Sequence, residues 1–145
     1  MTGWRIGFVV GSEDVIRGLR GVKTNVDSGV FQAIQIAAIE ALEGDQRDVE
    51  EGREIFRRRR DLMLKELGAL GLEVFPSPAT FYLWVKVPQG HTSTSFCELV
   101  LLEAGVVFTP GVGFGKYGEG YVRIALTVGE ERLEEALERL KKVPL

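Results

Sequence analysis

The sequence predicts an α/β fold, because the spacing of apolar residues changes along the chain. In residues 81–87 the aliphatic and Phe side chains fall on one side, with Tyr, Trp and Lys on the other. This period of two is typical of a β-strand. Residues 46–70 and 130–142 instead repeat apolar side chains at a spacing of three or four, as amphipathic helices do.

The first third of the chain is predicted to contain one strand and two helices. Residues 4–10 form an apolar run that predicts a buried strand. Ser12 then provides a favourable cap for a helix whose first turn carries two acidic residues. A second helix is predicted over residues 28–42, and Gly44 is placed to end it in the left-handed conformation.

A long helix and a small mixed segment are predicted to follow. Asp45 can cap the helix over residues 46–70, which at about 1.5 Å per residue would reach roughly 35 Å and could join two lobes. We therefore expect one domain over residues 1–44 and a second over 45–145. The remaining elements expected are a helix over 92–104 and strands over 106–108 and 121–126.

The composition excludes several classes of partner. With 18 basic and 21 acidic residues the net charge is −3, so no long-range positive field attracts nucleic acid or an anionic membrane. A small-molecule partner is expected instead. Cys97 and His91 are single residues of their types, which leaves no internal disulfide and no metal-ligand cluster. No apolar run approaches ~20 residues and no signal-peptide pattern is present, so a cytoplasmic location is expected.

Arg5 is a candidate binding residue because it lies within the apolar run of residues 4–10. A guanidinium buried there without compensation would be costly, so an anionic partner is expected. Phosphate is one such partner, since the planar guanidinium donates two hydrogen bonds to two oxygens. A structural ion pair and an exposed position at a sheet edge are the alternatives.

A glycine-rich segment precedes the strand predicted over residues 121–126. Residues 113–118 satisfy the spacing G-x-G-x-x-G, but a dinucleotide-binding fingerprint follows a strand and opens a helix, which is the reverse order. The P-loop pattern also fails, because Tyr117 stands where Ser or Thr is required. From the residues alone, the favoured interpretation is a tight turn, with Arg123 an ordinary strand residue.

Two motifs nevertheless resemble those of one enzyme family. The sequence MTGWRIGF over residues 1–8, and PGxxFG followed by GxxR over residues 110–123, are similar to the fold-type I, class I/II pyridoxal phosphate (PLP)-dependent aminotransferases. The sequence over residues 26–31 most resembles the aspartate and LL-diaminopimelate aminotransferase branches. This resemblance implies the C-terminal part of the PLP-transferase fold. It would comprise the end of the large domain and a small α/β domain whose short, largely antiparallel sheet packs against helices.

The resemblance also implies roles for three residues. Arg5 matches the arginine that contacts the cofactor phosphate, and Arg123 matches the arginine that binds the α-carboxylate of the substrate. Asn25 lies in a segment that reaches the neighbouring subunit's active site, which implies substrate binding; a role as a turn residue is the alternative. Amino acids and 2-oxo acids are the implied substrates, and a homodimer is the implied assembly.

In this family the lysine that forms the Schiff base with PLP precedes the arginine matched by Arg5, at a position that falls upstream of Met1. We therefore expect no catalytic residue, no covalent PLP and no transamination in the chain alone. A reading frame that begins at Met1 and an excised part of a longer enzyme both fit the sequence. A non-catalytic module that binds amino acids or phosphates, a dimerisation fragment and a lyase of the same fold type are the other functions considered.

Overall fold

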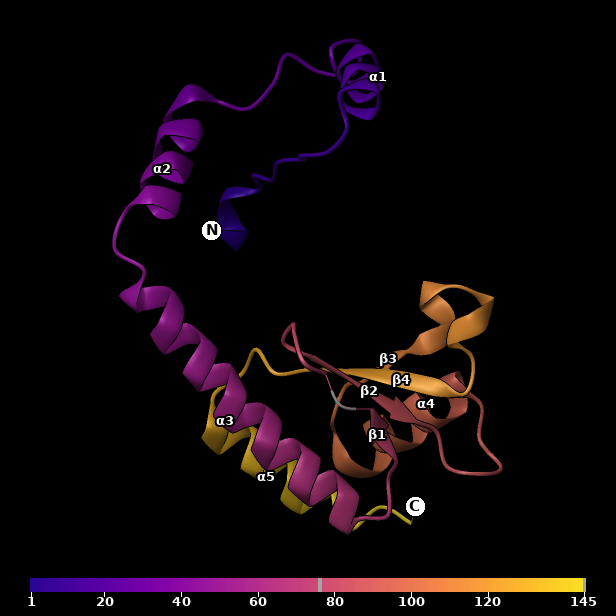
Figure 1. Ribbon diagram of the computed structural model, residues 1–145. Coiled ribbons are helices and arrows are strands. Elements are labelled where there is room, and N and C mark those ends of the chain that lie inside the picture. The colour runs from indigo at the N-terminus through magenta and orange to yellow at the C-terminus, as the bar shows by residue number, and fades with distance from the viewer. Residues whose placement is uncertain (76, 145) are drawn as a thin grey trace. The chain divides into compact units, whose positions relative to one another are not determined.

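The computed structural model describes residues 1–75 and 77–144, and the chain divides into two compact units, residues 1–50 and 51–145 (Figure 1). The first contains a 3₁₀ turn at Thr2–Trp4, helix α1 at Glu13–Lys23 and helix α2 at Gln32–Glu43. Helix α3, at Arg47–Ala69, begins in the first unit and continues in the second.

The strand predicted over residues 4–10 is wrong. The 3₁₀ turn precedes Arg5, whose φ of 51° is in the left-handed region, and no helix or strand follows before α1. A strand needs a neighbour to pair its backbone N–H and C=O groups, and no strand among the described residues pairs with this segment. Its apolar side chains are exposed, and Val10 is 82% exposed.

The two helices of the first unit form, but their ends differ from those predicted. Ser12 occupies the N-terminal cap of α1, although its side chain makes no capping hydrogen bond. Gly44 ends α2 in an extended conformation, with φ −77° and ψ −168°, so the predicted left-handed ending is wrong. Glycine is still favoured there, because a Cβ atom would lie 2.6 Å from the carbonyl oxygen of Glu40.

The long helix agrees closely with the sequence. Helix α3 begins and ends within one residue of the predicted 46–70, and the Asp45 carboxylate accepts a hydrogen bond of 3.0 Å from the backbone N–H of Arg47. Met63 and Leu67 of α3 are buried in the core of the second unit. That core also receives the buried face of helix α5, at Glu130–Leu140.

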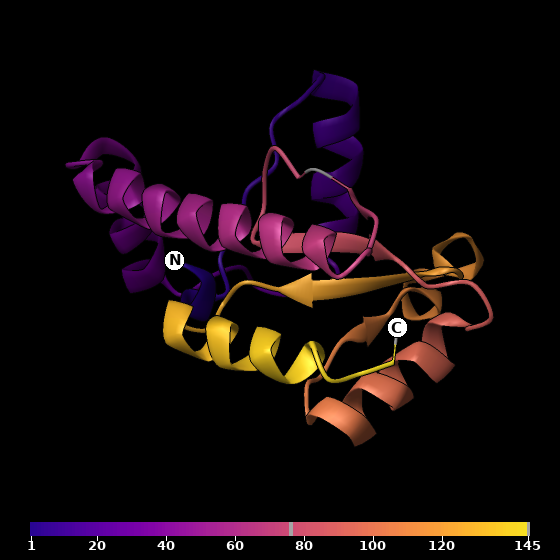
Figure 2. The same ribbon diagram turned by 90° about the horizontal axis from the view of Figure 1, so that it is seen from below.

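The second unit contains a four-stranded antiparallel sheet in the order β1-β2-β4-β3 (Figures 1 and 2). The strands are β1 at Val74–Phe75, β2 at Tyr82–Lys86, β3 at Thr109–Pro110 and β4 at Tyr121–Ala125. The predicted antiparallel sheet is confirmed. The strand expected at residues 106–108 is wrong, because pairing with β4 begins only at Thr109.

The two faces of the sheet differ. Alternate residues of β2 and β4 point toward the helices of this unit, where Leu83, Val85 and Val122 are fully buried. The other face carries aromatic side chains and Arg123, all of them half-buried. Helix α4, at Ser93–Ala104, begins with a reciprocal hydrogen-bonded cap at Thr92 and confirms the helix predicted there. None of the helices in the described ranges is long and apolar enough to cross a membrane.

Candidate functional site

Arg123 lies in the central strand β4, on the sheet face that the helices leave uncovered. Its guanidinium carbon lies 4.2 Å from the ring centroid of Tyr82 and 4.6 Å from that of Phe114. The side chain makes no salt bridge with a described residue, and its buried Nε has no hydrogen-bond partner among them. Buried polar groups in proteins are nearly always hydrogen-bonded, so this permanently charged group is fitted to receive an anion.

A hollow of about 240 Å³ lies beside Arg123, between β2 and the loop that precedes it. Thr80 of that loop has a φ of 72°, which is uncommon for a residue other than glycine. Its hydroxyl accepts a hydrogen bond of 3.2 Å from the backbone N–H of Tyr82 and lies 3.4 Å from the hydroxyl of Ser77. The hollow therefore offers one cation, two hydroxyl groups and aromatic walls to a small ligand.

The glycine-rich loop between β3 and β4 folds back on itself. A Cβ atom on Gly111 would lie 2.1 Å from the carbonyl oxygen of Gly118, and one on Gly118 would lie 2.0 Å from that of Gly111. Gly115 has a φ of 113°, which also favours glycine. The glycines are thus needed for a close backbone crossing. The loop leads into strand β4 and not into a helix, so it lacks the order of elements that a dinucleotide-binding fingerprint requires.

Glu119 fastens the end of this loop to helix α4. Its carboxylate accepts hydrogen bonds of 2.7 Å from the Ser93 backbone N–H, 2.9 Å from the Ser93 hydroxyl and 3.0 Å from the Gly120 N–H. These bonds, the one from the Ser93 backbone above all, hold the pKa of Glu119 below its ordinary value. Sequence reasoning missed this contact, because its partners lie 26 positions apart and no local pattern joins them.

Arg5 belongs to the first unit and is exposed, so the buried position expected from its apolar run is wrong. It makes no salt bridge with any described residue. A free guanidinium has the charge and the paired donors that a phosphate group requires. A role of Arg5 in binding the phosphate of PLP stays a prediction.

Asn25 also lies in the first unit, just after α1, and its side chain is exposed. The Nδ2 group donates a hydrogen bond of 2.7 Å to the carbonyl oxygen of Gly21, which closes the last turn of the helix. This contact agrees with the turn interpretation. A role of Asn25 in substrate binding stays a prediction.

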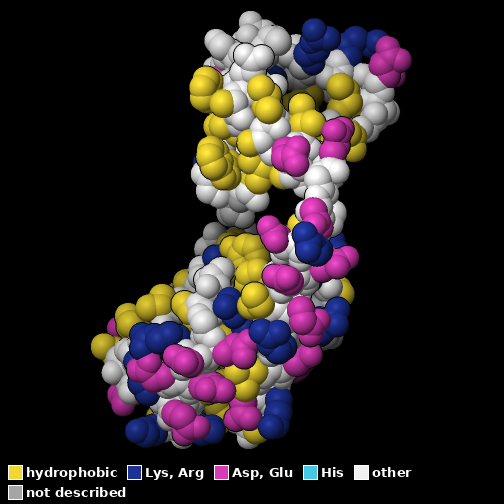
Figure 3. Space-filling model, turned by 90° about the vertical axis from the view of Figure 1, so that its left-hand side faces the viewer, with side chains coloured by type: hydrophobic (Ala, Val, Ile, Leu, Met, Phe, Trp, Pro, Cys, Tyr) yellow, Lys and Arg dark blue, Asp and Glu magenta, His cyan; other side chains and the backbone are white. Residues whose placement is uncertain are grey.

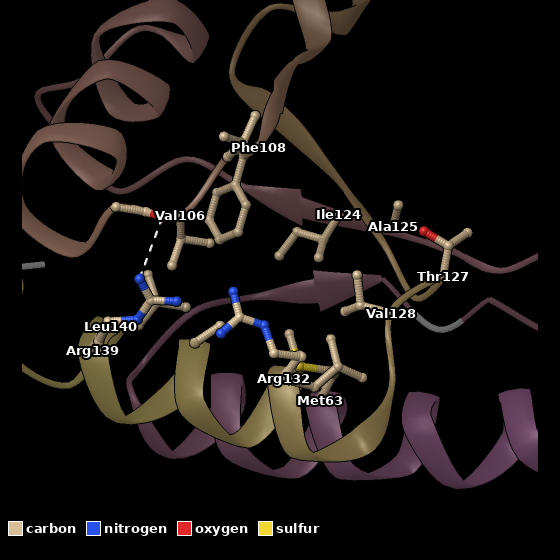
Figure 4. A pocket seen from close by; sticks show the side chains of 14 residues that line it. Met63, Val106, Phe108, Ile124, Ala125, Thr127, Val128, Arg132, Arg139 and Leu140 are labelled. Atoms are coloured by element: carbon tan, nitrogen blue, oxygen red, sulfur yellow. Dashed lines mark hydrogen bonds between the residues drawn. The ribbon is translucent and has the colours of Figure 1, made fainter.

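A second hollow, of about 370 Å³, lies on the helix side of the sheet (Figure 4). Apolar side chains from β4, the segment before β3 and α5 line it, and Arg132 and Arg139 extend across it. Both arginines pair with Glu135, and the Nη1 of Arg139 approaches the carbonyl oxygen of Gly105 at 3.5 Å. The two arginines of this hollow therefore already have an anionic partner, whereas Arg123 has none among the described residues.

Comparison with known proteins places this arrangement in a family. Residues 1–140 match the family described as aminotransferase class I and II. The LL-diaminopimelate aminotransferase of Halothermothrix orenii is 57% identical over 141 residues, which are 97% of this chain and 36% of the relative. That of Aquifex aeolicus is 54% identical over 145 residues, covering 100% of this chain and 38% of the relative. The chain thus spans little more than a third of the curated relatives it matches.

Solved structures agree. The aromatic aminotransferase from Pyrococcus horikoshii has a TM-score of 0.91 and 40% identity, with 99% of this chain and 39% of that chain covered. The aspartate aminotransferase from Thermus thermophilus with maleate has a TM-score of 0.88 and 38% identity, with 99% and 38% covered. The predicted fold class, the C-terminal part of the PLP-transferase fold, is confirmed. The chain belongs to the aminotransferase class I and II family.

Proposed function

We propose that this chain carries the substrate-carboxylate site of a PLP-dependent aminotransferase, which moves an amino group between an amino acid and a 2-oxo acid. The observation that carries the proposal is the Arg123 guanidinium, stacked on Tyr82 and Phe114 and without an anionic partner among the described residues. Every amino acid and 2-oxo acid has an α-carboxylate. A bidentate contact from Arg123 would bind that group and orient the reacting centre.

The aromatic rings around Arg123 would strengthen this contact, because they cover part of the guanidinium and shield it from water. Arg5 would bind the cofactor through its phosphate, with two parallel hydrogen bonds. When bound, PLP supplies the electron sink on which transamination depends. The residues of this chain bind and orient the cofactor and the substrate. None of them is proposed to transfer the proton that transamination moves between carbon atoms.

For the substrate we propose LL-diaminopimelate. The support is the sequence identity of 57% and 54% with two LL-diaminopimelate aminotransferases, against 40% and 38% with the aromatic and aspartate enzymes of known structure. Asn25, exposed at the end of α1, is proposed to contact substrate. We also propose a cytoplasmic homodimer, and propose that the chain alone does not transaminate.

The test is Arg123→Lys in the complete enzyme, meaning this chain together with the amino-terminal portion that its relatives possess. Lysine keeps the charge but loses the planar pair of donors, so kcat/KM for the amino acid should fall on the order of 10- to 1000-fold. PLP content, measured by absorbance, should stay unchanged. Arg132→Lys, on the other side of the sheet, is the control and should behave as wild type. A wild-type kcat/KM for Arg123→Lys would refute the proposal.

A further inference from the structure

We propose that Phe114 is a positioning residue that holds the Arg123 guanidinium, together with Tyr82, in the orientation that a substrate carboxylate requires. The inference rests on the proposed function of Arg123 and adds a second residue to the same site. It also gives the glycine-rich loop a purpose, since that loop carries Phe114.

Two aromatic rings restrain the side chain of Arg123. Arginine side chains have several rotatable bonds and lose conformational freedom when they are fixed. No described carboxylate pairs with Arg123. Its guanidinium group contacts the two rings instead, with the guanidinium carbon 4.2 and 4.6 Å from their centroids. Both distances are well within the ~6 Å range of cation–π attraction.

Aromatic stacking restrains a guanidinium in a way that an ion pair cannot. A protein carboxylate would occupy the N–H donors that the substrate needs. A ring contacts the flat face instead and leaves the donors at the edge of the plane available. Stacking on Phe114 and Tyr82 therefore orients Arg123 before the substrate arrives, which reduces the entropy lost on binding.

The loop is built to place the ring of Phe114. Its two ends meet where Gly111 and Gly118 cross, so close that neither position tolerates a Cβ atom. Trp84 supports the ring from the sheet, with an edge-to-face contact at a centroid distance of 5.9 Å. Trp84 is in turn stacked on Tyr121 at 5.7 Å.

Proximity in sequence does not explain the contact. Tyr117 lies in the same loop, yet it is 87% exposed and its ring contacts Lys116, at 4.9 Å, rather than Arg123. Phe114 is 54% exposed because one side of its ring faces Arg123 and Trp84. Tyr117 is therefore a matched control: an aromatic residue of the same loop that leaves Arg123 untouched.

The experiment compares Phe114→Leu, Phe114→Tyr and Tyr117→Leu in the complete enzyme. Leucine keeps the apolar bulk but has no ring face, so KM for the amino acid and Kd for maleate should rise about threefold to thirtyfold. The value of kcat at saturation should change much less, and PLP content should match wild type. Phe114→Tyr, which restores a ring, and Tyr117→Leu should both remain near wild type.

Arg123→Lys, measured alongside, separates this inference from the proposed function. If Arg123→Lys weakens maleate binding and Phe114→Leu does not, Phe114 has no positioning role and the function of Arg123 stands. If Tyr117→Leu raises KM as much as Phe114→Leu, the effect belongs to the loop in general and the inference is wrong. Phe114→Met is a second variant should Phe114→Leu lose PLP: it keeps a large apolar side chain but has no ring face, and should raise Kd for maleate to a similar extent.

Discussion

Arg123 and Arg5 both present a guanidinium without an anionic partner among the described residues, but the chain holds them differently. Arg123 projects from a regular strand and lies against two rings, so its orientation is restrained before any ligand binds. Arg5 follows a 3₁₀ turn, has a φ of 51° and is exposed. No described ion pair restrains its orientation before a ligand binds.

Arg5→Ala in the complete enzyme should weaken cofactor binding and spare substrate recognition. Charge-assisted hydrogen bonds to phosphate would be lost, so the Kd for PLP should rise roughly 10- to 100-fold. The measurement is PLP retained after dialysis, followed by KM for the amino acid at saturating PLP. Arg17→Ala is the control, since Arg17 is exposed in the same unit and pairs with Glu13 and Asp14. Full retention of PLP by Arg5→Ala would remove Arg5 from the site.

Only those residues of the site that belong to a recognisable sequence motif could be predicted. The sequence identifies Arg123 only through the resemblance of PGxxFG followed by GxxR to a family motif, since the residues alone favour an ordinary strand position. The contact of Phe114 with Arg123 was not predicted, because it depends on how the loop folds back between Gly111 and Gly118. The stacking of Tyr82 on Arg123 likewise depends on strand register, and no local pattern sets the register between β2 and β4.

At the scale of elements, one carboxylate joins the glycine-rich loop to helix α4. Glu119 accepts two hydrogen bonds from Ser93, the first residue of α4, which is fully buried. A negative charge at a helix N-terminus is favourable, because the backbone N–H groups there have no partners within the helix. The end of the loop that carries Phe114 is therefore fixed to the core through α4.

This arrangement predicts a pH-dependent stability. The pKa of Glu119 is lower in the folded chain than its unfolded value of about 4.3, so its carboxylate stabilises the fold above that pH. The contribution is lost as the pH falls through the folded pKa. Glu119→Gln should therefore be less stable than wild type at pH 7, with the difference shrinking below about pH 4.

Urea unfolding at pH 7 and at pH 3.5, followed by tryptophan fluorescence, measures this difference. Glu98→Gln is the control, because Glu98 is exposed on helix α4 and makes no salt bridge with a described residue. A difference between Glu119→Gln and wild type that stays constant across this pH range would show that the carboxylate does not titrate as proposed.

Elements that bury their apolar residues within the second unit were predictable from periodicity. Helix α3 and strand β2 lie within one residue of the ranges that the sequence predicts, because their own residues form much of the core against which they pack. Residues 4–10 and 106–108 have the apolar runs of strands, but no strand in the described part of the chain pairs along their length. Whether such a run becomes a strand depends on residues elsewhere, and its own sequence carries no information about them.

At the scale of the whole chain, the two units differ in what they bury. The second unit has an extensive core of residues from α3, α4, α5 and the sheet. None of the described side chains of residues 1–50 is buried, and α1 and α2 expose large apolar residues, which gather over this unit in Figure 3. Helices of this length are marginal without tertiary packing, so the first unit requires a further surface to stabilise it.

We expect the chain by itself to form no borohydride-reducible adduct with PLP and no 2-oxo acid from LL-diaminopimelate. A lysine that forms a Schiff base must lose its proton, and such lysines have a lowered pKa. Lys86 and Lys141 instead donate hydrogen bonds to the carboxylates of Glu73 and Glu138, which raises the pKa of both lysines, and Lys23 pairs with Asp27.

Mass spectrometry of tryptic peptides after borohydride reduction locates any adduct, and the complete enzyme serves as the positive control. Adding the separately expressed amino-terminal portion of the Halothermothrix orenii relative should restore both the adduct, on that portion, and the product. This follows because the exposed apolar residues of α1 and α2 would then gain a surface to pack against. An adduct on any of the six lysines of this chain would instead show that it holds a catalytic amine of its own.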